Sequence, residues 1–279
     1  MQIWAHTLVK NEEKYLWYSV ASVIDYVDRL LLWDSGSTDR TLEICQALKQ
    51  RYPEKIDFKK VLMRTAQEFP KARQKMLDAT GADWFLIVDG DEVWWDDSIK
   101  KVINTIKVRG ENIESVVVPN LLPVGDIFHY QEKAAGMYKF LGKVGHYNQR
   151  AFRRDIPGLK SVNPHGTWGW ADGEGKMVQD RDPAKIKYMD APYLHFSFLQ
   201  RAGSKNYDLA VFKRKQKLKH ELGIPFSKDY FYPEVFFRPR PKVVPSPWEA
   251  MRSRFRLRAY IETPLRLIKR RIIKGKAGY

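Results

Sequence analysis

The stretch Trp84-Phe85-Leu86-Ile87-Val88-Asp89-Gly90-Asp91-Glu92 decides the fold, because five apolar residues run directly into an acidic cluster. A short apolar run bounded by polar residues predicts a buried strand. In open α/β sheets, ligands bind at the edge where the strands have their carboxyl ends. We therefore expect these acidic side chains to leave the sheet at a binding site.

As far as about residue 120, the chain alternates between short apolar segments and amphipathic helical segments. Further strands are predicted at 2–9, 29–33, 56–62 and 114–118. Helices are predicted from the Ser37-Thr38-Asp39 cap and from Asp97 or Ser98, and Gly110 is expected to end the second. This alternation predicts an α/β fold in which helices cover a mostly parallel sheet.

Composition and charge narrow the class of protein. The 279 residues include 49 Lys and Arg against 33 Asp and Glu, a net charge of +16, and 44% are hydrophobic. This hydrophobic content excludes a disordered tail protein, and the positive field favours partners that carry phosphate. Cys45 is the one cysteine, which excludes an internal disulfide and a cysteine-rich zinc site. We expect a cytoplasmic protein, because no leader pattern opens the sequence and no apolar run is long enough to cross a bilayer.

The carboxylates that follow the apolar stretch predict a cation site. Asp89 and Asp91 at one strand end would repel each other unless a cation joins them, and Mn²⁺ or Mg²⁺ favours such oxygen ligands. The alternative is that these acids cap a turn and pair with nearby Lys or Arg. A second triplet of the same form, Asp180-Arg181-Asp182, does not follow an apolar strand and carries no such prediction.

Four short runs, taken together and in this order, resemble family 2 glycosyltransferases of the GT-A fold. They are Val9-Lys10-Asn11-Glu12-Glu13, Leu32-Trp33-Asp34-Ser35-Gly36-Ser37-Thr38-Asp39-Arg40-Thr41, Ala72-Arg73-Gln74 and Val88-Asp89-Gly90-Asp91-Glu92. The similarity spans about the first 120 residues and is greatest to enzymes that build lipopolysaccharide cores and other surface glycans. It implies a Rossmann-like mixed sheet flanked by helices. It also implies a UDP-, GDP- or dTDP-sugar donor, Mn²⁺ or Mg²⁺, and inverting transfer of one sugar to a glycan or lipid-linked acceptor.

The resemblance also implies a role for particular residues. It places Asp34 on the nucleotide base and Asn11 and Glu12 around the base and ribose. It places Asp89 on the ribose, Arg73 near the diphosphate, and Asp91, with His195 as a second ligand, on the metal. Plain alternatives stay open: a helix cap for Asn11 and Glu12, a surface cation for Arg73, and a core histidine for His195.

An inverting transferase also needs a general base for the acceptor hydroxyl. Where related enzymes carry a His-Glu pair, this chain has His165-Gly166-Thr167. We therefore predict the base at Asp172 or Glu174, with Asp190 and Asp126 as further candidates, although each could be a solvated loop acid. His165 and Trp168-Gly169-Trp170 suit a platform on which a sugar stacks, or they are core residues.

The chain divides into three predicted parts. Residues 1–220 form the GT-A catalytic domain, with a nucleotide-sugar-binding half at 1–120 and an acceptor-binding half at 121–220 that ends in a basic helix from Tyr207 to Leu222. Six prolines make 221–247 an irregular arm. Residues 248–279 form a basic amphipathic helical tail, whose helix is expected to begin at Ser246-Pro247-Trp248-Glu249 and to restart at Thr263-Pro264.

The tail is expected to hold the protein on the anionic inner face of a membrane. It carries ten Lys and Arg against two Glu, with apolar residues between them. A helix packed on the domain with a solvated basic face is the alternative. Nucleic acid is not an expected partner, because no nucleic-acid-binding signature is present. Two other functions stay open: a sugar nucleotidyltransferase of similar fold, and a noncatalytic protein that binds membranes or nucleic acid.

Overall fold

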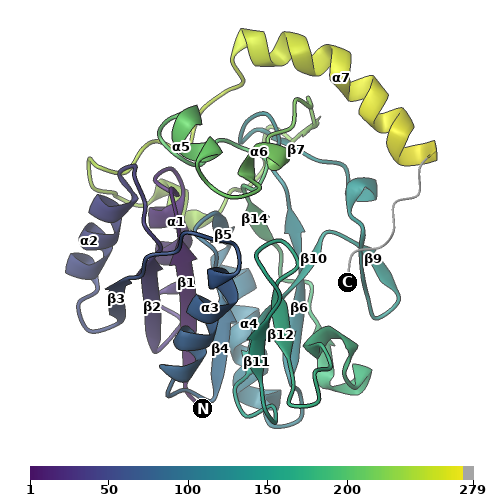
Figure 1. The fold of residues 1–279 in the computed structure, drawn as a ribbon. Coiled ribbons are helices and arrows are strands. Elements are labelled where there is room, and N and C mark those ends of the chain that lie inside the picture. The colour runs from purple at the N-terminus through teal and green to yellow at the C-terminus, as the bar shows by residue number, and fades with distance from the viewer. Residues whose placement is uncertain (273–279) are drawn as a thin grey trace.

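The computed structural model describes residues 1–272, and their principal feature is one large mixed sheet (Figure 1). The strands run in the order β3-β2-β1-β4-β10-β6-β14-β5, and β13 pairs with β6 outside this path. The strands are β1 (Ile3–Val9), β2 (Arg29–Asp34), β3 (Ile56–Lys60), β4 (Trp84–Ile87), β5 (Glu92–Trp94), β6 (Ser115–Leu121), β10 (Tyr147–Arg153), β13 (Ile186–Tyr188) and β14 (Tyr193–His195). Every strand predicted in the first 120 residues is present.

Strand direction brings the acidic residues to one edge. Strands β1 to β4 are parallel to one another, and β10 is antiparallel to both β4 and β6. Strand β14 runs parallel to β6 and antiparallel to β5. The carboxyl ends of β1, β2, β4 and β14 therefore meet at the same edge of the sheet.

Helices cover both faces of this sheet, as the α/β prediction requires. Helices α1 (Leu16–Val23), α2 (Thr41–Arg51) and α4 (Asp96–Arg109) pack on one face, where Ile3, Ala5 and Val9 of β1 contribute to the largest hydrophobic cluster. The other face carries α3 (Glu68–Asp78) and the hairpin of β11 (Lys160–Val162) and β12 (Gly169–Ala171). Alternate residues of β1 thus belong to opposite layers, because successive side chains of a strand point to opposite faces.

Smaller elements complete the structure outside the sheet. Strand β7 (His129–Tyr130) pairs with β15 (Ile224–Pro225), and β8 (Tyr138–Phe140) pairs with β9 (Lys143–Gly145). The 3₁₀ helices are η1 (Lys133–Ala135), η2 (Val178–Asp180), η3 (Pro183–Lys185) and η4 (Glu234–Phe237). Within 221–247, Val235, Phe236 and Val244 are buried in the largest cluster. The proline-rich segment therefore wraps against the molecule.

Two helix predictions are wrong in detail. In place of one helix from Tyr207 to Leu222, the chain forms α5 (Lys205–Leu209) and α6 (Arg214–Lys217), interrupted at Lys213 by a left-handed φ of 58°. This break turns Arg214 inward, where it is buried.

The last helix, α7, runs from Ser253 to Ile272 and does not begin at Ser246. Trp248 instead makes edge-to-face contacts with the rings of Tyr232 and Phe236. Pro264 lies inside α7 and does not restart it. Residues 273–279 of the predicted tail lie outside the described residues.

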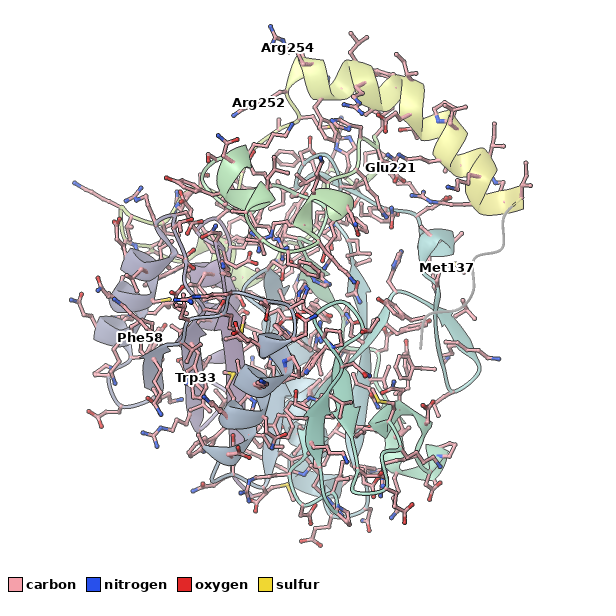
Figure 2. All side chains as sticks on the ribbon, viewed as in Figure 1. Trp33, Phe58, Met137, Glu221, Arg252 and Arg254 are labelled. Carbon is pink, nitrogen blue, oxygen red and sulfur yellow. The ribbon has the colours of Figure 1, made fainter. Side chains whose placement is uncertain are left out.

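Helix α7 lies across one end of the molecule (Figure 1). Arg254 at its start points away from the domain, whereas Glu221 lies beneath the helix (Figure 2). Only Ala259 of this helix is buried. Within residues 1–272, neither α7 nor any other helix has the length and apolar character needed to span a bilayer.

Candidate active site

Two polar residues join the ends of β1 and β2. Asn11 adopts a left-handed φ of 55°, and its Oδ1 accepts a hydrogen bond from the Thr38 amide at 2.7 Å. Asp34 Oδ2 accepts hydrogen bonds from the Gly36 and Ser37 amides, both at 3.1 Å. Asp34 Oδ1 is buried and has no partner among the described residues. Since buried polar atoms are almost always paired, this oxygen is available to a bound ligand.

Asp89 lies between two arginines at the end of β4. Arg73 Nη2 from α3 is 2.5 Å from Asp89 Oδ1, and Arg150 Nη2 from β10 is 3.5 Å from Asp89 Oδ2. The Arg73 guanidinium lies over the rings of Phe69 and Trp168, at 5.3 and 5.1 Å from their centroids. Burial opposes ionisation of Asp89, but the two arginines outweigh it and lower the pKa of its carboxyl. Asp89 is therefore an anion held in a fixed position.

Asp91 is deeper and meets residues from the end of β14. Its Oδ2 accepts a hydrogen bond from Arg201 and lies 3.5 Å from His195 Nε2. Burial raises the pKa of Asp91, yet Arg201 and His195 together bring it well below the usual range. His195 Nε2 also lies 2.7 Å from Ser197 Oγ and 3.8 Å from Glu92 Oε1. His195 is half-buried, and its contacts place it beside the acidic residues that follow β4.

Glu12 connects the end of β1 to two further arginines. Its Oε1 lies 3.1 Å from Arg201 Nη1 and 2.5 Å from Arg214 Nη2. Arg214 also donates to the Lys10 carbonyl at 3.0 Å and to the Asn11 carbonyl at 2.5 Å. Burial raises the pKa of Glu12 to about 8 despite both arginines. Glu12 Oε2, like Asp34 Oδ1, has no partner among residues 1–272.

Lys217 and His165 add further nitrogen groups to this edge. Burial and Arg201 lower the pKa of Lys217, whereas Asp91 and Asp89 oppose that change. In the described part of the chain, Lys217 has no carboxylate within ion-pair distance. Burial, followed by Lys217, lowers the pKa of His165 to about 4, so its imidazole is neutral at pH 7. Of the predicted sugar platform, Trp170 is a core residue packed on Phe85.

The structure does not support the prediction that Asp172 or Glu174 is the general base. Asp172 Oδ1 accepts from the amides of Glu174 (3.1 Å) and Lys176 (2.9 Å), and Oδ2 pairs with Arg181. Although burial opposes ionisation, these partners lower the pKa of Asp172, which makes it a poor proton acceptor. Glu174 is exposed.

The loop that carries Asp172 also lies at the wrong end of β4. The Gly173 amide donates to the Pro157 carbonyl at 2.8 Å, and the nearby Arg154 amide donates to the Asp83 carbonyl at 2.9 Å. Asp83 precedes β4, whereas Asp89 and Asp91 follow it. The two further base candidates do not replace Asp172, because Asp190 is exposed and Asp126 binds His129 and the Met251 amide.

The structure thus brings seven predicted residues to one edge and leaves two outside it. The seven are Asn11, Glu12, Asp34, Arg73, Asp89, Asp91 and His195. Arg150, Arg214 and Lys217 were not predicted. Arg150 carried no local signal, because its strand β10 also contains Asn148, Gln149 and Arg153. Arg214 and Lys217 carried none, since they lie in a run of like charges that reads as a solvated helix face.

Comparison with known proteins identifies the class to which this fold and site belong. The family model described as "Glycosyl transferase family 2" matches residues 6–165, more than half of the chain. The chain therefore belongs to glycosyl transferase family 2. This assignment confirms the family resemblance predicted from the sequence.

Two curated relatives match parts of the chain. A dTDP-rhamnosyl transferase, RfbG of Shigella flexneri, is 27% identical over 124 residues, which cover 41% of this chain and 42% of that protein. A TPR repeat-containing protein of Synechococcus elongatus is 34% identical over 87 residues, covering 30% of this chain and 19% of that one. The chain thus matches less than half the length of either relative.

Solved structures of low sequence identity also resemble this fold. S. aureus TarS 1–349 aligns with a TM-score of 0.43 and 17% identity, covering 71% of this chain and 61% of TarS 1–349. Glucosyl-3-phosphoglycerate synthase of Mycobacterium tuberculosis, solved with Mg²⁺ and UDP, aligns with a TM-score of 0.45 and 20% identity, covering 70% of this chain and 71% of that one.

Proposed function

We propose that this protein transfers a sugar from a UDP-, GDP- or dTDP-sugar to a glycan or lipid-linked acceptor, with inversion at the anomeric carbon. The observation that supports it best is the set of acidic side chains at the ends of β1, β2 and β4. The cations around them are Arg73, Arg150, Arg201, Arg214 and Lys217. Asp34 Oδ1 and Glu12 Oε2 are the unpaired acceptors suited to a nucleoside. The arginines and Lys217 suit its diphosphate.

We further propose that a divalent cation, Mn²⁺ or Mg²⁺, belongs to this reaction. Within residues 1–272, no three His, Cys, Asp or Glu side chains are grouped to hold a metal ion. Asp91 Oδ2 and His195 Nε2 nevertheless face each other at 3.5 Å, and Mg²⁺ commonly takes few protein ligands beside substrate phosphates. These two residues fit the protein's share of such a site, provided that Asp91 gives up its contact with Arg201. When bound, the cation would neutralise charge on the departing nucleoside diphosphate.

The remaining chemistry is assigned to this chain's own residues. Asp34 and Asn11 hold the nucleoside end, and Asp89, fixed by Arg73, is placed to accept hydrogen bonds from the ribose. Arg201 and Lys217 stabilise negative charge that develops on the leaving diphosphate, because both are preorganised and partly desolvated.

A panel of nucleotide sugars, each with Mn²⁺ or with EDTA, tests this function by thermal shift. A ligand that binds only the folded protein raises its melting temperature. We expect one nucleotide family to raise it with Mn²⁺, and Asp34→Ala to abolish the increase. If no nucleotide sugar raises the melting temperature of the native chain under either condition, the proposal is wrong.

We also propose that the protein works at the inner face of a membrane and that α7 is the contact. Leu257, Ile261, Leu265, Ile268 and Ile272 recur at helical spacing along one line and are 51–74% exposed. Arg254, Arg258 and Lys269 border this stripe. An exposed apolar stripe with flanking cations is typical of a helix that lies in the interface of an anionic bilayer.

A further inference from the structure

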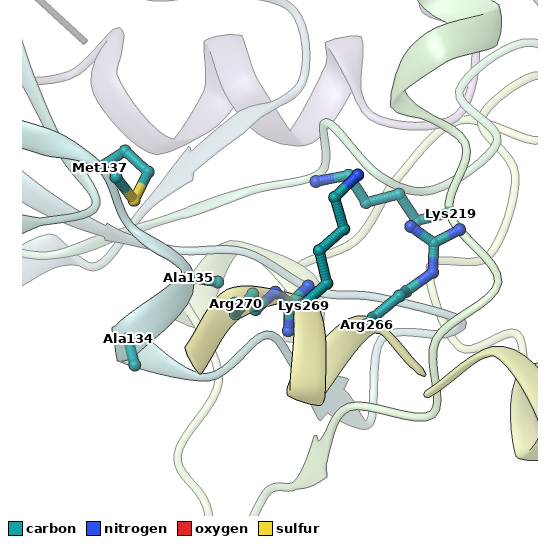
Figure 3. A pocket seen from close by; sticks show the side chains of 7 residues that line it. All are labelled: Ala134, Ala135, Met137, Lys219, Arg266, Lys269 and Arg270. Carbon is teal, nitrogen blue, oxygen red and sulfur yellow. The ribbon is translucent and has the colours of Figure 1, made fainter. Parts of the chain in front are cut away.

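A pocket of about 270 Å³ lies under α7, between this helix and the turn at η1 (Figure 3). Ala134, Ala135 and Met137 form its apolar side. Its other lining residues are all cations, namely Lys219, Arg266, Lys269 and Arg270. A cavity that combines an apolar side with four cations suits an anionic group attached to an apolar body.

The two arginines of this pocket are held in place by acids. Arg270 pairs with both oxygens of Glu221 at 2.6 Å, and Arg266 Nη2 lies 2.7 Å from Glu262 Oε2. Such bidentate and charge-assisted contacts fix the direction of a guanidinium. The arginines therefore form rigid walls whose charge is largely balanced.

The two lysines differ from the arginines, because neither has an ion-pair partner in the described part of the chain. Lys219 is half-buried, and its ammonium lies 4.0 Å from the centroid of the Phe198 ring. Burial, then Arg270, lowers the pKa of Lys219, which means that its charge is incompletely compensated. A bound anion would relieve this cost. Lys269 is exposed at the mouth of the pocket.

The pocket lies between the proposed membrane contact and the catalytic edge. Lys269 of α7 is one residue beyond Ile268, a member of the exposed apolar stripe. Lys219 follows two residues after Lys217, which interacts electrostatically with Asp91 and Asp89. His146, whose ring bonds the Glu132 carbonyl at 3.2 Å, lies within the electrostatic reach of Lys219, Arg270 and His195.

We propose that this pocket binds the phosphate group of a lipid-borne acceptor, with Lys219 and Lys269 as its principal ligands. Two observations favour a lipid phosphate: the apolar side of the cavity and the apolar stripe on the helix that roofs it. Because the pocket is near the proposed catalytic edge, we infer that the bound phosphate belongs to the acceptor and not to a headgroup of the surrounding membrane. This inference rests on the proposed function, because it names the acceptor's chemistry.

Calorimetric titration of the full chain with dihexanoyl phosphatidic acid tests the pocket. Dihexanoylglycerol is the matched probe without phosphate, and inorganic phosphate is the matched probe without lipid. We expect the phosphatidic acid to bind, the glycerol compound not to bind, and inorganic phosphate to compete weakly. Lys219→Gln with Lys269→Gln should weaken phosphatidic acid binding by about tenfold or more, as expected for two charge-assisted contacts.

Lys101→Gln with Lys107→Gln on α4 is the control, because it removes the same charge from exposed positions on another helix. It should leave phosphatidic acid binding unchanged. Lys219→Gln could disturb folding, because Lys219 packs on Phe198. The single variant Lys269→Gln avoids this problem, because Lys269 is exposed. Equal binding by the double variant and the native chain, or equal binding of dihexanoylglycerol, would overturn the inference.

The titration requires no turnover, so it tests the pocket assignment independently of the proposed transfer reaction. If transfer is never observed but phosphatidic acid still binds through the lysines, the transferase proposal fails and the pocket stands. If transfer is observed and the lysine variants bind like the native chain, the pocket assignment fails alone. Binding to phosphatidylglycerol vesicles distinguishes a lipid-borne acceptor from a bulk lipid headgroup. If the double lysine variant loses vesicle binding and phosphatidic acid binding equally, the pocket is a headgroup site and the acceptor assignment is refuted.

Discussion

Arg201 donates a hydrogen bond to Asp91 from a position 110 residues further along the chain, and both side chains are buried. The same guanidinium lies 3.1 Å from Glu12, so it neutralises acids from the ends of β1 and β4 together. Removing one partner of a buried pair leaves an uncompensated charge, which is usually more costly than the pair itself.

Arg201→Met should lower the free energy of unfolding by about 3 kcal/mol, because Asp91 and Glu12 then lose their shared counter-charge. Urea denaturation of the single variants and of Arg201→Met with Asp91→Asn measures this effect. The double variant should recover part of the loss. Strictly additive losses would show that the two side chains do not interact.

Asp91→Asn should reduce transfer by at least about a hundredfold, because an amide replaces the anion that the proposed cation requires. Asp180→Asn is the matched control, since Asp180 belongs to the second acidic triplet and is exposed. Initial rates with Mn²⁺ compare the two. Normal turnover by Asp91→Asn would remove this residue from the active site.

Asp172→Asn should lower the melting temperature yet change kcat by no more than about twofold, because its carboxylate binds Arg181 and loop amides away from the catalytic edge. Glu174→Gln, in the same loop but exposed, should change neither quantity. A fall in kcat without loss of stability in either variant would restore the general base to this loop.

The contribution of Glu12 and Glu92 to stability should decrease as the pH rises from about 5 to about 8. Glu12 has its pKa raised from 4.5 to about 8 and Glu92 to about 7, so in this range the folded state binds more protons than the unfolded state. Asp89 and Asp91 have lowered pKa values, remain ionised throughout, and do not contribute there. The melting temperature should fall less steeply with pH for Glu12→Gln than for Glu54→Gln. The second variant replaces an exposed glutamate and is the control. An equal pH dependence of the melting temperature in the two variants would contradict the assignment.

Leu265→Asp should weaken binding to phosphatidylglycerol vesicles by at least about tenfold, because it removes an apolar contact and adds a repelled charge. Val108→Asp places the same charge on an exposed apolar position of α4 and should leave vesicle binding unchanged. Cosedimentation at low and high salt measures both. Equal binding of the two variants would exclude α7 as the membrane contact.

The sequence predicted the strands and the acidic edge well, because both follow from local patterns such as the apolar run into Asp89 and Asp91. It did not predict which cations meet those acids. Arg150 and Arg214 reach the edge through strand pairing and through the break at Lys213, which depend on contacts distant in the chain. The pairing of Asp172 with Arg181, which argues against Asp172 as the general base, was not predicted either.

The contacts of Arg214 with Lys10, Asn11 and Glu12 have a consequence for truncated forms of this enzyme. A fragment cut at residue 165, where the family match stops, would keep Glu12 and Asp91 but lose Arg201, which contacts both acids, and Arg214, which contacts Glu12. Two carboxylates would then share a desolvated corner without any counter-ion. The later portion of the polypeptide is therefore required to complete the acidic edge of the sheet, and residues 1–165 should not fold into a working catalyst by themselves.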